Sequence, residues 1–400
     1  MKRSAIDAGD KKQAIVDAAV AVLARKGKNA TISEIASVAG VNDSIIYHYF
    51  ENKTDLLFHA AGKSLQYRLA DLEHHLEGIR EPVSRLSKLI WYQLTYHDDE
   101  PGYARFSIFY CRTNHAFFRH EASVSFINWI QVLHRILKDG VEDGSFSGDI
   151  SLSIVNAMVL GVLDISNIQV FTGQRKENAK EDFEAILDLI LAVLNEGSPA
   201  KKEASAGQDR RAMILIGAER VFAEKSFDKA TTIDIARASG VAEGTLYEYF
   251  KGKQDILFSC LSHRFNGHID EIENLFTVIT PPERLARFIR KHFFLYLKNP
   301  EFAQTFISGG IYNEAFYKSP AYKDFLNYLK IIDDILEEGK RGGFFRPEVD
   351  GRIFRNLFVG CFSQLLLRWS NSSPRSYYDT VYAINRSVEL LLRSVMKVAS

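Results

Sequence analysis

The stretch GVNDSIIYHYFENKTDLLF, residues 40–58, decides the fold, because the chain repeats it as GVAEGTLYEYFKGKQDILF at residues 240–258. The two stretches align without a gap, and nearly half of their positions are identical. In the first stretch the shared residues are Gly40, Val41, Tyr47, Tyr49, Phe50, Lys53, Asp55, Leu57 and Phe58. Self-similarity at a fixed spacing is the signature of a repeat architecture. We therefore interpret the chain as a duplication with one structural unit in each half.

Composition predicts a globular protein of several domains. The chain has 400 residues, of which 46% are hydrophobic and 25% charged. No uninterrupted apolar run approaches the roughly 20 residues that span a bilayer, so we expect a cytoplasmic protein without a membrane partner. Cys111, Cys260 and Cys361 are odd in number and far apart, which predicts reduced, buried thiols. The net charge is zero; DNA-binding proteins usually carry a basic face, but a balanced total does not exclude one.

Apolar residues recur at helical spacing almost throughout, which predicts an all-α fold. Two short helices are expected over TISEIASVAG and TTIDIARASG, each closed by a glycine, Gly40 or Gly240, in a left-handed turn. Asp43 or Ser44 is expected to cap a further short helix that ends at Tyr49. A long amphipathic helix is expected from Lys53 to about residue 76.

We predict five segments. They are a helix-turn-helix domain (1–52), a helical domain (53–196), a linker (197–208), a second helix-turn-helix domain (209–252) and a second helical domain (253–400). The last two helices of each half are too apolar to face water, so we expect the two pairs to pack together as an intramolecular pseudo-dimer. Association of whole chains stays open.

Two short helices that meet at a glycine and are braced by an amphipathic helix form a helix-turn-helix unit, whose second short helix enters the DNA major groove. This pattern resembles the TetR-type transcriptional regulators, most closely over residues 11–60 and 210–260. The second copy matches the family pattern at Thr231, Ile235, Ala236, Gly240, Val241, Gly244, Thr245, Leu246, Tyr247, Tyr249, Phe250 and Lys253. The resemblance implies double-stranded DNA as the partner. The implied DNA-binding residues are Thr31, Asn42, Ser44, Ile45, Tyr47, His48, Lys53, Thr231, Gly244, Thr245, Tyr247, Glu248 and Lys253.

Within this set the resemblance implies that Thr245 and Tyr247 hold phosphates, that Lys253 contacts the DNA backbone and that Glu248 faces bases. The first copy departs from the pattern, because Ile45 replaces the phosphate-binding threonine. Isoleucine cannot hydrogen-bond a phosphate, although it can contact a thymine methyl group. Asn42 either binds adenine or caps the helix.

The middle of each half is rich in aromatic residues, most of which we expect to fill the core. The family resemblance also implies a cavity there for a small apolar or aromatic effector that releases the protein from its operator. The candidate pocket residues are Trp91, Tyr92, Phe109, Tyr110, Trp129, Phe293, Phe306, Tyr312 and Phe325. Possible polar anchors are Cys111, Asn114, His134 and Asn313, each with a structural role as the alternative.

No spacing predicts a metal site: His74 and His75 are adjacent, and His115 and His120 are five residues apart. Catalytic and cofactor-binding motifs are absent from the sequence, so we predict no enzyme and no cofactor. The predicted function is a DNA-binding regulator, a repressor, with two heads that read unlike half-sites. The rival hypothesis is a ligand-binding or protein-interaction module whose heads no longer bind DNA, and an enzyme that uses the helical pocket ranks third.

Overall fold

The computed structural model describes residues 2–195, 210–273, 280–371 and 377–397. These residues form helices and no strand, apart from an isolated bridge between Phe345 and Met396. The all-α prediction is therefore confirmed. The chain divides into two compact units, residues 1–148 with 166–183 and residues 149–165 with 184–400. The predicted linker, residues 197–208, lies outside the described residues.

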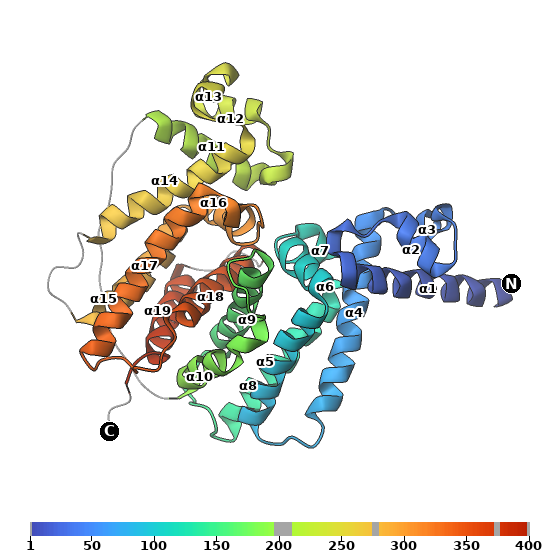
Figure 1. Ribbon diagram of the computed structural model, residues 1–400, viewed down its shortest axis with the longest axis horizontal. Helices are drawn as coiled ribbons and strands as arrows, with labels where there is room; N and C mark the ends of the chain where they lie inside the picture. Colours follow the sequence, from blue (N-terminus) through green and yellow to red (C-terminus); the bar gives the residue numbers. More distant parts are fainter. Residues whose placement is uncertain (1, 196–209, 274–279, 372–376, 398–400) are drawn as a thin grey trace. The chain divides into compact units, whose positions relative to one another are not determined.

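The first unit contains a three-helix head and most of the first helical domain (Figure 1). Its head consists of α1 (Lys2–Lys26), α2 (Ile32–Ala39) and α3 (Asp43–Tyr49). The helices that follow are α4 (Lys53–Leu76), α5 (Pro82–Asp99), α6 (Pro101–Phe106), a π-helical stretch (Ser107–Cys111), α7 (His115–Arg119) and α8 (Ser123–Glu142). Asp43 begins α3, and Asn42 occupies the N-cap position, so the expectation that Asp43 or Ser44 caps this helix was wrong.

The second unit repeats this order of helices and includes most of the last two helices of the first half, through residues 149–165 and 184–195. The first half ends with α9 (Leu152–Phe171) and α10 (Phe183–Leu194). The second half comprises α11 (Arg210–Lys229), α12 (Thr232–Ser239), α13 (Glu243–Tyr249), α14 (Lys253–Glu273), α15 (Pro281–Lys298), α16 (Pro300–Thr305), a π-helical stretch (Phe306–Ile311), a 3₁₀ turn (Phe316–Lys318), α17 (Pro320–Arg341), α18 (Gly351–Asn371) and α19 (Tyr377–Arg393). Both halves thus carry a π-helical stretch after a short helix that begins with proline.

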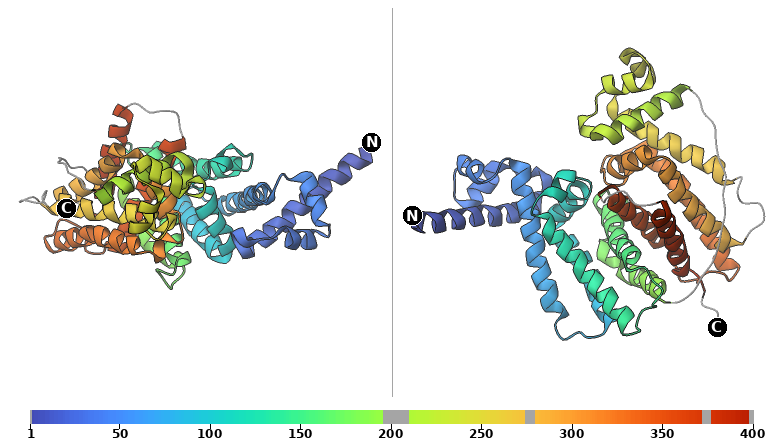
Figure 2. Two further views of the ribbon diagram at one scale, coloured as in Figure 1. Left: turned by 90° about the horizontal axis from the view of Figure 1, so that it is seen from above. Right: turned by 180° about the vertical axis from the view of Figure 1, so that it is seen from behind.

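Within the second unit, α9 and α10 lie beside α18 and α19 (Figure 2). The closest approach is at Gly161 of α9 and Gly360 of α18: a Cβ atom added to either glycine would lie 2.2 Å from the other's backbone carbonyl carbon. No side chain fits between two helices at that separation. The two glycines therefore allow the backbones to touch.

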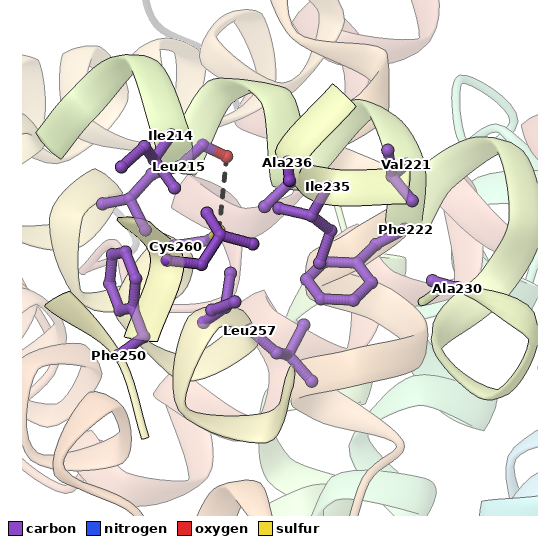
Figure 3. Close-up of a cluster of buried hydrophobic side chains, with 13 residues drawn as sticks. Ile214, Leu215, Val221, Phe222, Ala230, Ile235, Ala236, Phe250, Leu257 and Cys260 are labelled. Atoms are coloured by element: carbon purple, nitrogen blue, oxygen red, sulfur yellow. Dashed lines mark hydrogen bonds between the residues drawn. The ribbon is translucent and has the colours of Figure 1, made fainter. Parts of the chain in front are cut away.

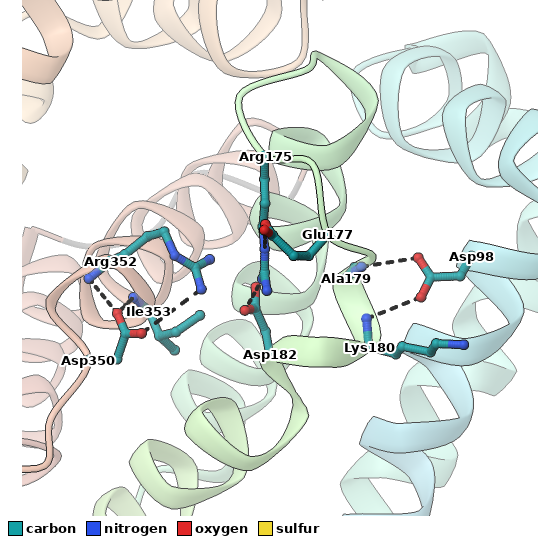
Figure 4. Close-up of polar contacts among 9 residues, drawn as sticks. All are labelled: Asp98, Arg175, Glu177, Ala179, Lys180, Asp182, Asp350, Arg352 and Ile353. Carbon is teal, nitrogen blue, oxygen red and sulfur yellow. Dashed lines mark hydrogen bonds and ion pairs between the residues drawn. The ribbon is translucent and has the colours of Figure 1, made fainter.

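The connector before the last two helices has the same structure in both halves. Gly140 and Gly339 lie against the rings of Phe146 and Phe345, which come within 2.1 and 2.0 Å of an added Cβ. Polar caps fix the segments around these helices (Figure 4). In the first unit Asp98 accepts hydrogen bonds of 3.1 Å from the N–H groups of residues 179 and 180. In the second unit Asp350 accepts from the first turn of α18, with 2.8 Å to the N–H of Arg352.

Helix α9 bears on the expectation that the protein has no membrane partner. It is the one helix among the described residues that is long and apolar enough to cross a membrane, with a mean hydropathy of 1.6 over its most apolar window. However, 83% of that window is buried inside the protein. This burial is typical of a core helix. The three cysteines are buried and form no disulfide, as predicted.

Candidate nucleic-acid interface

Each head is held together by a small hydrophobic core beneath its two short helices. In the second head this core joins α11, α12 and α13 to the start of α14 (Figure 3). Its fully buried members include Leu215, Ile235, Leu246 and Leu257. The thiol of Cys260 contacts the carbonyl oxygen of Leu215 at 3.4 Å. Because the core is continuous with α14, the orientation of the short helices is tied to the helix that leads into the second helical domain.

Thr31 and Thr231 occupy the N-cap positions of α2 and α12, where each forms a capping box. The box partners are Glu34 and Asp234, whose carboxylates accept from the threonine N–H groups at 3.1 Å. A side-chain hydrogen bond from Lys26 lowers the pKa of Glu34 to about 2, and one from Lys225 has the same effect on Asp234. Both threonine side chains are therefore occupied within the protein, at the start of a helix whose free N–H groups favour anions.

The turn between the two short helices has the predicted form. Gly40 and Gly240 adopt left-handed conformations, with φ of 66° and 68°. At this φ a side chain would be strained, so glycine sets the angle between α2 and α3, and between α12 and α13.

The predicted base-facing side chains of α3 project away from the core. Tyr47 is 58% exposed and Ile45 is 38% exposed, whereas Ile46 between them is fully buried. Asn42 makes no capping hydrogen bond through its side chain, so its amide remains exposed for another partner. Ser44 and His48 are also exposed.

Helix α13 presents the matching surface in the second head. Tyr247 is 56% exposed, while Leu246 beside it is buried. The space around the Cα of Gly244 is open, with no atom within 4 Å of an added Cβ, and Thr245 is half-buried. The side chain of Glu248 lies outside the described residues, so its base-facing role stays a prediction.

The two lysines that follow these helices, which we predict to contact the DNA backbone, donate hydrogen bonds within their own heads. Lys53 donates to the carbonyl oxygen of Lys28 at 2.9 Å. Lys253 donates to the carbonyl oxygens of Phe227 at 2.6 Å and Ala230 at 3.0 Å, and its ammonium group lies 4.4 Å from the centre of the Phe227 ring. Both ammonium groups thus fasten α4 or α14 to the connector that precedes the short helices. Sequence spacing missed this role because the acceptors lie 23 to 26 residues earlier.

Neither short recognition helix carries a lysine or arginine. We therefore expect phosphate contacts from uncharged donors, such as Tyr47 and Tyr247, and from neighbouring cations. Arg237 in the last turn of α12 is an exposed cation of the second head.

The structure brings together three groups that sequence spacing kept apart. Asp55 and His59 of α4 and His120 from the α7–α8 connector have ligand-type atoms within 4.8 Å of one another. The side chain of His120 is only 17% exposed. Its Nε2 lies 2.9 Å from Oδ1 of Asp55, while the N–H of Ala122 donates to its Nδ1 at 3.1 Å.

That backbone donor decides the chemistry of the cluster. Because Nδ1 of His120 accepts a hydrogen bond, the neutral ring carries its proton on Nε2 and donates it to Asp55. A metal would need a lone pair at Nε2, which this proton occupies. Burial raises the pKa of Asp55. Hydrogen bonds from His120 and from the N–H of Glu51 lower it by more, so that the pKa of Asp55 lies below its ordinary value. The cluster therefore links the start of α4 to the α7–α8 connector.

Four of the predicted pocket residues in the second half are buried in an aromatic core. Phe306 contacts Phe325 with ring centres 5.3 Å apart, and Phe293 contacts Phe362 at 5.2 Å. Tyr312 donates to Asp164 at 3.5 Å. Asn313 accepts a hydrogen bond from the N–H of Ala315, so its role is structural.

In the first half the predicted pocket residues separate into buried and exposed groups. Tyr92 and Trp129 are buried with ring centres 6.2 Å apart, and Trp129 donates to Gln93 at 3.0 Å. Phe109 is half-buried. Trp91 and Tyr110 are 41% and 40% exposed. These two side chains therefore reach the surface, although the ring of Tyr110 also stacks on that of the buried Phe106, with ring centres 5.4 Å apart.

Among the proposed polar anchors, Cys111 is buried and His134 is exposed. Asn114 caps α7 by accepting from the N–H of Ala116. An open groove of 590 Å³ lies on the first head between α1 and α2, lined by residues that include Arg25, Glu34 and Val38. None of the predicted pocket residues lines this groove.

Sequence reasoning missed a buried histidine in the regulatory domain. His97 of α5 is 1% exposed, and its Nδ1 has no hydrogen-bond partner among the described residues. Burial, together with the nearby charge of Arg112, lowers its pKa to about 3. Its position on the apolar face of a predicted helix was the only available signal.

Two family models each match the chain twice. The model described as bacterial regulatory proteins of the tetR family matches residues 15–60 and 214–260. The model described as the C-terminal region of YsiA-like protein matches residues 63–196 and 261–394. Together they cover most of both halves.

Curated relatives agree with these matches. The chain is 30% identical over 183 residues to the fatty acid metabolism regulator protein of Bacillus subtilis strain 168, which covers 46% of this chain and 93% of the relative. It is 35% identical over 80 residues to the transcriptional regulator HbdR of Aromatoleum sp. strain CIB, covering 20% of this chain and 35% of that protein. Among solved structures, FadR from Bacillus subtilis in complex with stearoyl-CoA matches with a TM-score of 0.40 and 22% identity, covering 45% of this chain and 97% of that one. The chain belongs to the TetR family of DNA-binding transcriptional regulators, as two tandem copies of the family's architecture.

Proposed function

We propose that this regulator works as a single-chain counterpart of a dimeric repressor, in which the two halves pair with each other and present two unlike heads to one operator. The observation that carries the proposal is the contact of α9 with α18 at Gly161 and Gly360. Helix-turn-helix dimers bind two half-sites one helical turn apart, so a repressor needs two heads held together. Here one chain supplies both heads, and its own last helices supply the pairing surface.

The effector that we propose is a molecule with a long acyl chain. The Bacillus subtilis relative, 93% of whose length matches this chain, is named as a regulator of fatty acid metabolism. The regulatory domains offer an apolar and aromatic interior, with Tyr296, Phe306 and Phe325 fully or almost fully buried in the second half. Apolar interiors with few polar groups are typical of sites for such ligands.

Effector binding would reach the first head through α6. The backbone of Gly102 in α6 lies so close to α1 that an added Cβ would be 2.5 Å from the carbonyl oxygen of Ala24. In the second half the hydroxyl of Thr305 in α16 contacts the carbonyl oxygen of Glu219 in α11 at 3.4 Å. A shift of α6 or α16 therefore moves the first helix of each head, and a coupling free energy of about 1–3 kcal/mol is typical of such systems.

The proposal is tested by fluorescence anisotropy on operator DNA recovered by selection with the full chain. We expect one chain to bind each operator, and we expect stearoyl-CoA to weaken binding while free coenzyme A does not. Two chains per operator would contradict the single-chain pair. Equal effects of stearoyl-CoA and coenzyme A would contradict the acyl effector.

A further inference from the structure

Two groups of ion pairs join the first half to the second within the second unit. Asp149, just before α9, accepts from Arg393 at 3.0 and 2.7 Å through its two oxygens, and from Arg386 at 2.9 Å. Asp188 of α10 accepts two hydrogen bonds of 2.7 Å from Arg346. In both groups the first half supplies the carboxylate and the second half supplies the guanidinium.

These arginines are largely buried, so the charge of the residue that each one pairs with is important. The side chain of Arg393 is only 3% exposed, and those of Arg386 and Arg346 are 12% and 15% exposed. Arg393 also donates to the carbonyl oxygen of Asn195 at 2.6 Å, and Arg346 to that of Ser394 at 2.9 Å. The carboxylates of Asp149 and Asp188 accept from Arg393 and Arg346, respectively, through two parallel hydrogen bonds each. This bidentate arrangement is the strongest form of an arginine–carboxylate contact. Replacing a carboxylate with a cation would leave a desolvated guanidinium facing a like charge.

The repeat identifies which residues would meet if two like halves paired. In the connectors Phe146 corresponds to Phe345, so Ser147 corresponds to Arg346 and Asp149 to Glu348. On the last helices the buried positions of α10 repeat on α19 at a constant offset. These positions are Ile186, Leu189, Ile190, Val193 and Leu194 in α10, and Ile384, Ser387, Val388, Leu391 and Leu392 in α19. Asp188 of α10 therefore corresponds to Arg386 of α19, a reversal of charge.

A pair of two first halves would be repulsive by this correspondence. Asp149 of each copy would face Asp188 of the other, and Ser147 would offer no cation between them. In the structure, where a first half pairs with a second half, the two acids at the equivalent site are Glu348 and Asp188. Arg346 binds both of them, at 3.1 Å and 2.7 Å. A pair of two second halves would instead bring Arg346 and Arg386 together beside Glu348 and Glu389, the latter being the residue that already pairs with Arg386 on α19.

We propose that this arrangement of charges makes the first half select the second half as its partner and reject a second copy of itself. The inference rests on the proposed pairing within the chain and adds a cause for its specificity. Complementary charges suppress wrong partners because like charges that are juxtaposed at an interface are strongly unfavourable. The predicted partner of an isolated first half is thus the second half of any copy of this chain.

The experiment uses the full chain with a protease site placed in the linker at residues 197–208 and cut after folding. Native mass spectrometry then distinguishes the three possible pairs, because the two halves differ in mass. For the unaltered sequence we expect one pair, of a first and a second half. Separate single halves would overturn the proposed intramolecular pair, and a mixture of all three pairs would overturn only the charge-based selection.

The decisive variant is Asp188→Arg, which gives the first half the charge that Arg386 has in the second half. Asp149 and the new arginine can then pair across two first halves, while Arg346 is repelled. We expect pairs of first halves to appear and the unlike pair to decline more than about tenfold. The matched control is Glu184→Arg, which reverses an exposed charge one turn earlier on α10 and should leave the unlike pair unchanged. If Asp188→Arg kept only the unlike pair, charge would not select the partner.

Discussion

Among the residues that the structure describes, Ser226 is the only one other than glycine with a positive φ (φ 61°, ψ 161°). It forms a kink within α11 after Lys225, where the first head has Gly27 after Lys26 at the end of α1. Gly27 has a similar φ of 55°. Backbone conformations of this kind cost a residue with a side chain of order 1–3 kcal/mol, which glycine avoids.

We therefore predict that Ser226→Gly stabilises the second head by about 1 kcal/mol, after allowance for the greater freedom of glycine in the unfolded chain. Thermal unfolding followed by circular dichroism measures the change. The reverse substitution, Gly27→Ser, is the matched control and should destabilise the first head, because its Cβ would lie 2.8 Å from the carbonyl oxygen of Gly102. An unfolding temperature that falls with Ser226→Gly would contradict the strain assigned to this residue.

The buried His97 predicts a pH dependence of stability. Its pKa is about 3 in the folded protein and about 6.5 in an unfolded chain, so below pH 6.5 only the unfolded chain takes up a proton there. The free energy of unfolding then decreases by about 1.4 kcal/mol per pH unit as pH falls from 6.5 towards 3, and the contribution of His97 is fully present above 6.5. His97→Leu should remove this slope. Urea unfolding at pH 7.5 and pH 5.5 tests it: parallel losses in both proteins would exclude His97 as the cause.

At the scale of helices, the crossing of α9 and α18 depends on two glycines. Gly161→Ala would place a methyl group 2.2 Å from the backbone of Gly360, so the helices must separate. We expect a loss of about 1–3 kcal/mol, as is typical of overpacked cores. Gly148→Ala serves as the control, because no atom lies within 4 Å of its added Cβ. Equal unfolding midpoints for the two variants in guanidinium chloride would show that the close crossing is not needed.

The parts of this structure that depend on neighbours in sequence could be predicted from it. The left-handed Gly240 and the exposed Tyr247 follow from local spacing and were recognised, whereas the capping role of Thr231 was not. The contacts that could not be predicted join distant segments: Lys253 binds carbonyls 23–26 residues earlier, and Asp55 meets a histidine 65 residues later. Apolar patterning indicated that the last helices pair, but it could not show which charges of one half meet which charges of the other.

At the scale of the whole molecule, duplication frees the two heads from a constraint that identical subunits impose. Two identical recognition helices require a nearly palindromic operator. Here α3 exposes Ile45 and His48, whereas the corresponding positions of α13 hold Thr245 and Glu248. Histidine can donate to guanine or phosphate, while glutamate accepts from cytosine, so we expect the favoured bases to differ. A good bidentate contact discriminates between bases by about 1–3 kcal/mol.

We therefore predict that selection from random DNA with the full chain recovers an asymmetric site, whose two halves differ in sequence.

Matched substitutions assign each half-site to a head. Thr245→Ile removes a hydroxyl that can bind phosphate and should weaken binding by about 1 kcal/mol, about fivefold, whereas Ile45→Thr adds that hydroxyl to the first head and should strengthen binding. Neither change alters His48 or Glu248, the residues that we predict to face bases, so affinity should move in opposite directions while the base preference assigned to these two residues stays the same. Glu248→Ala, in contrast, should relax the base preference in one half-site alone. Recovery of a perfect inverted repeat, equally constrained on both sides, would mean that both heads read the same bases and that the duplication serves another purpose.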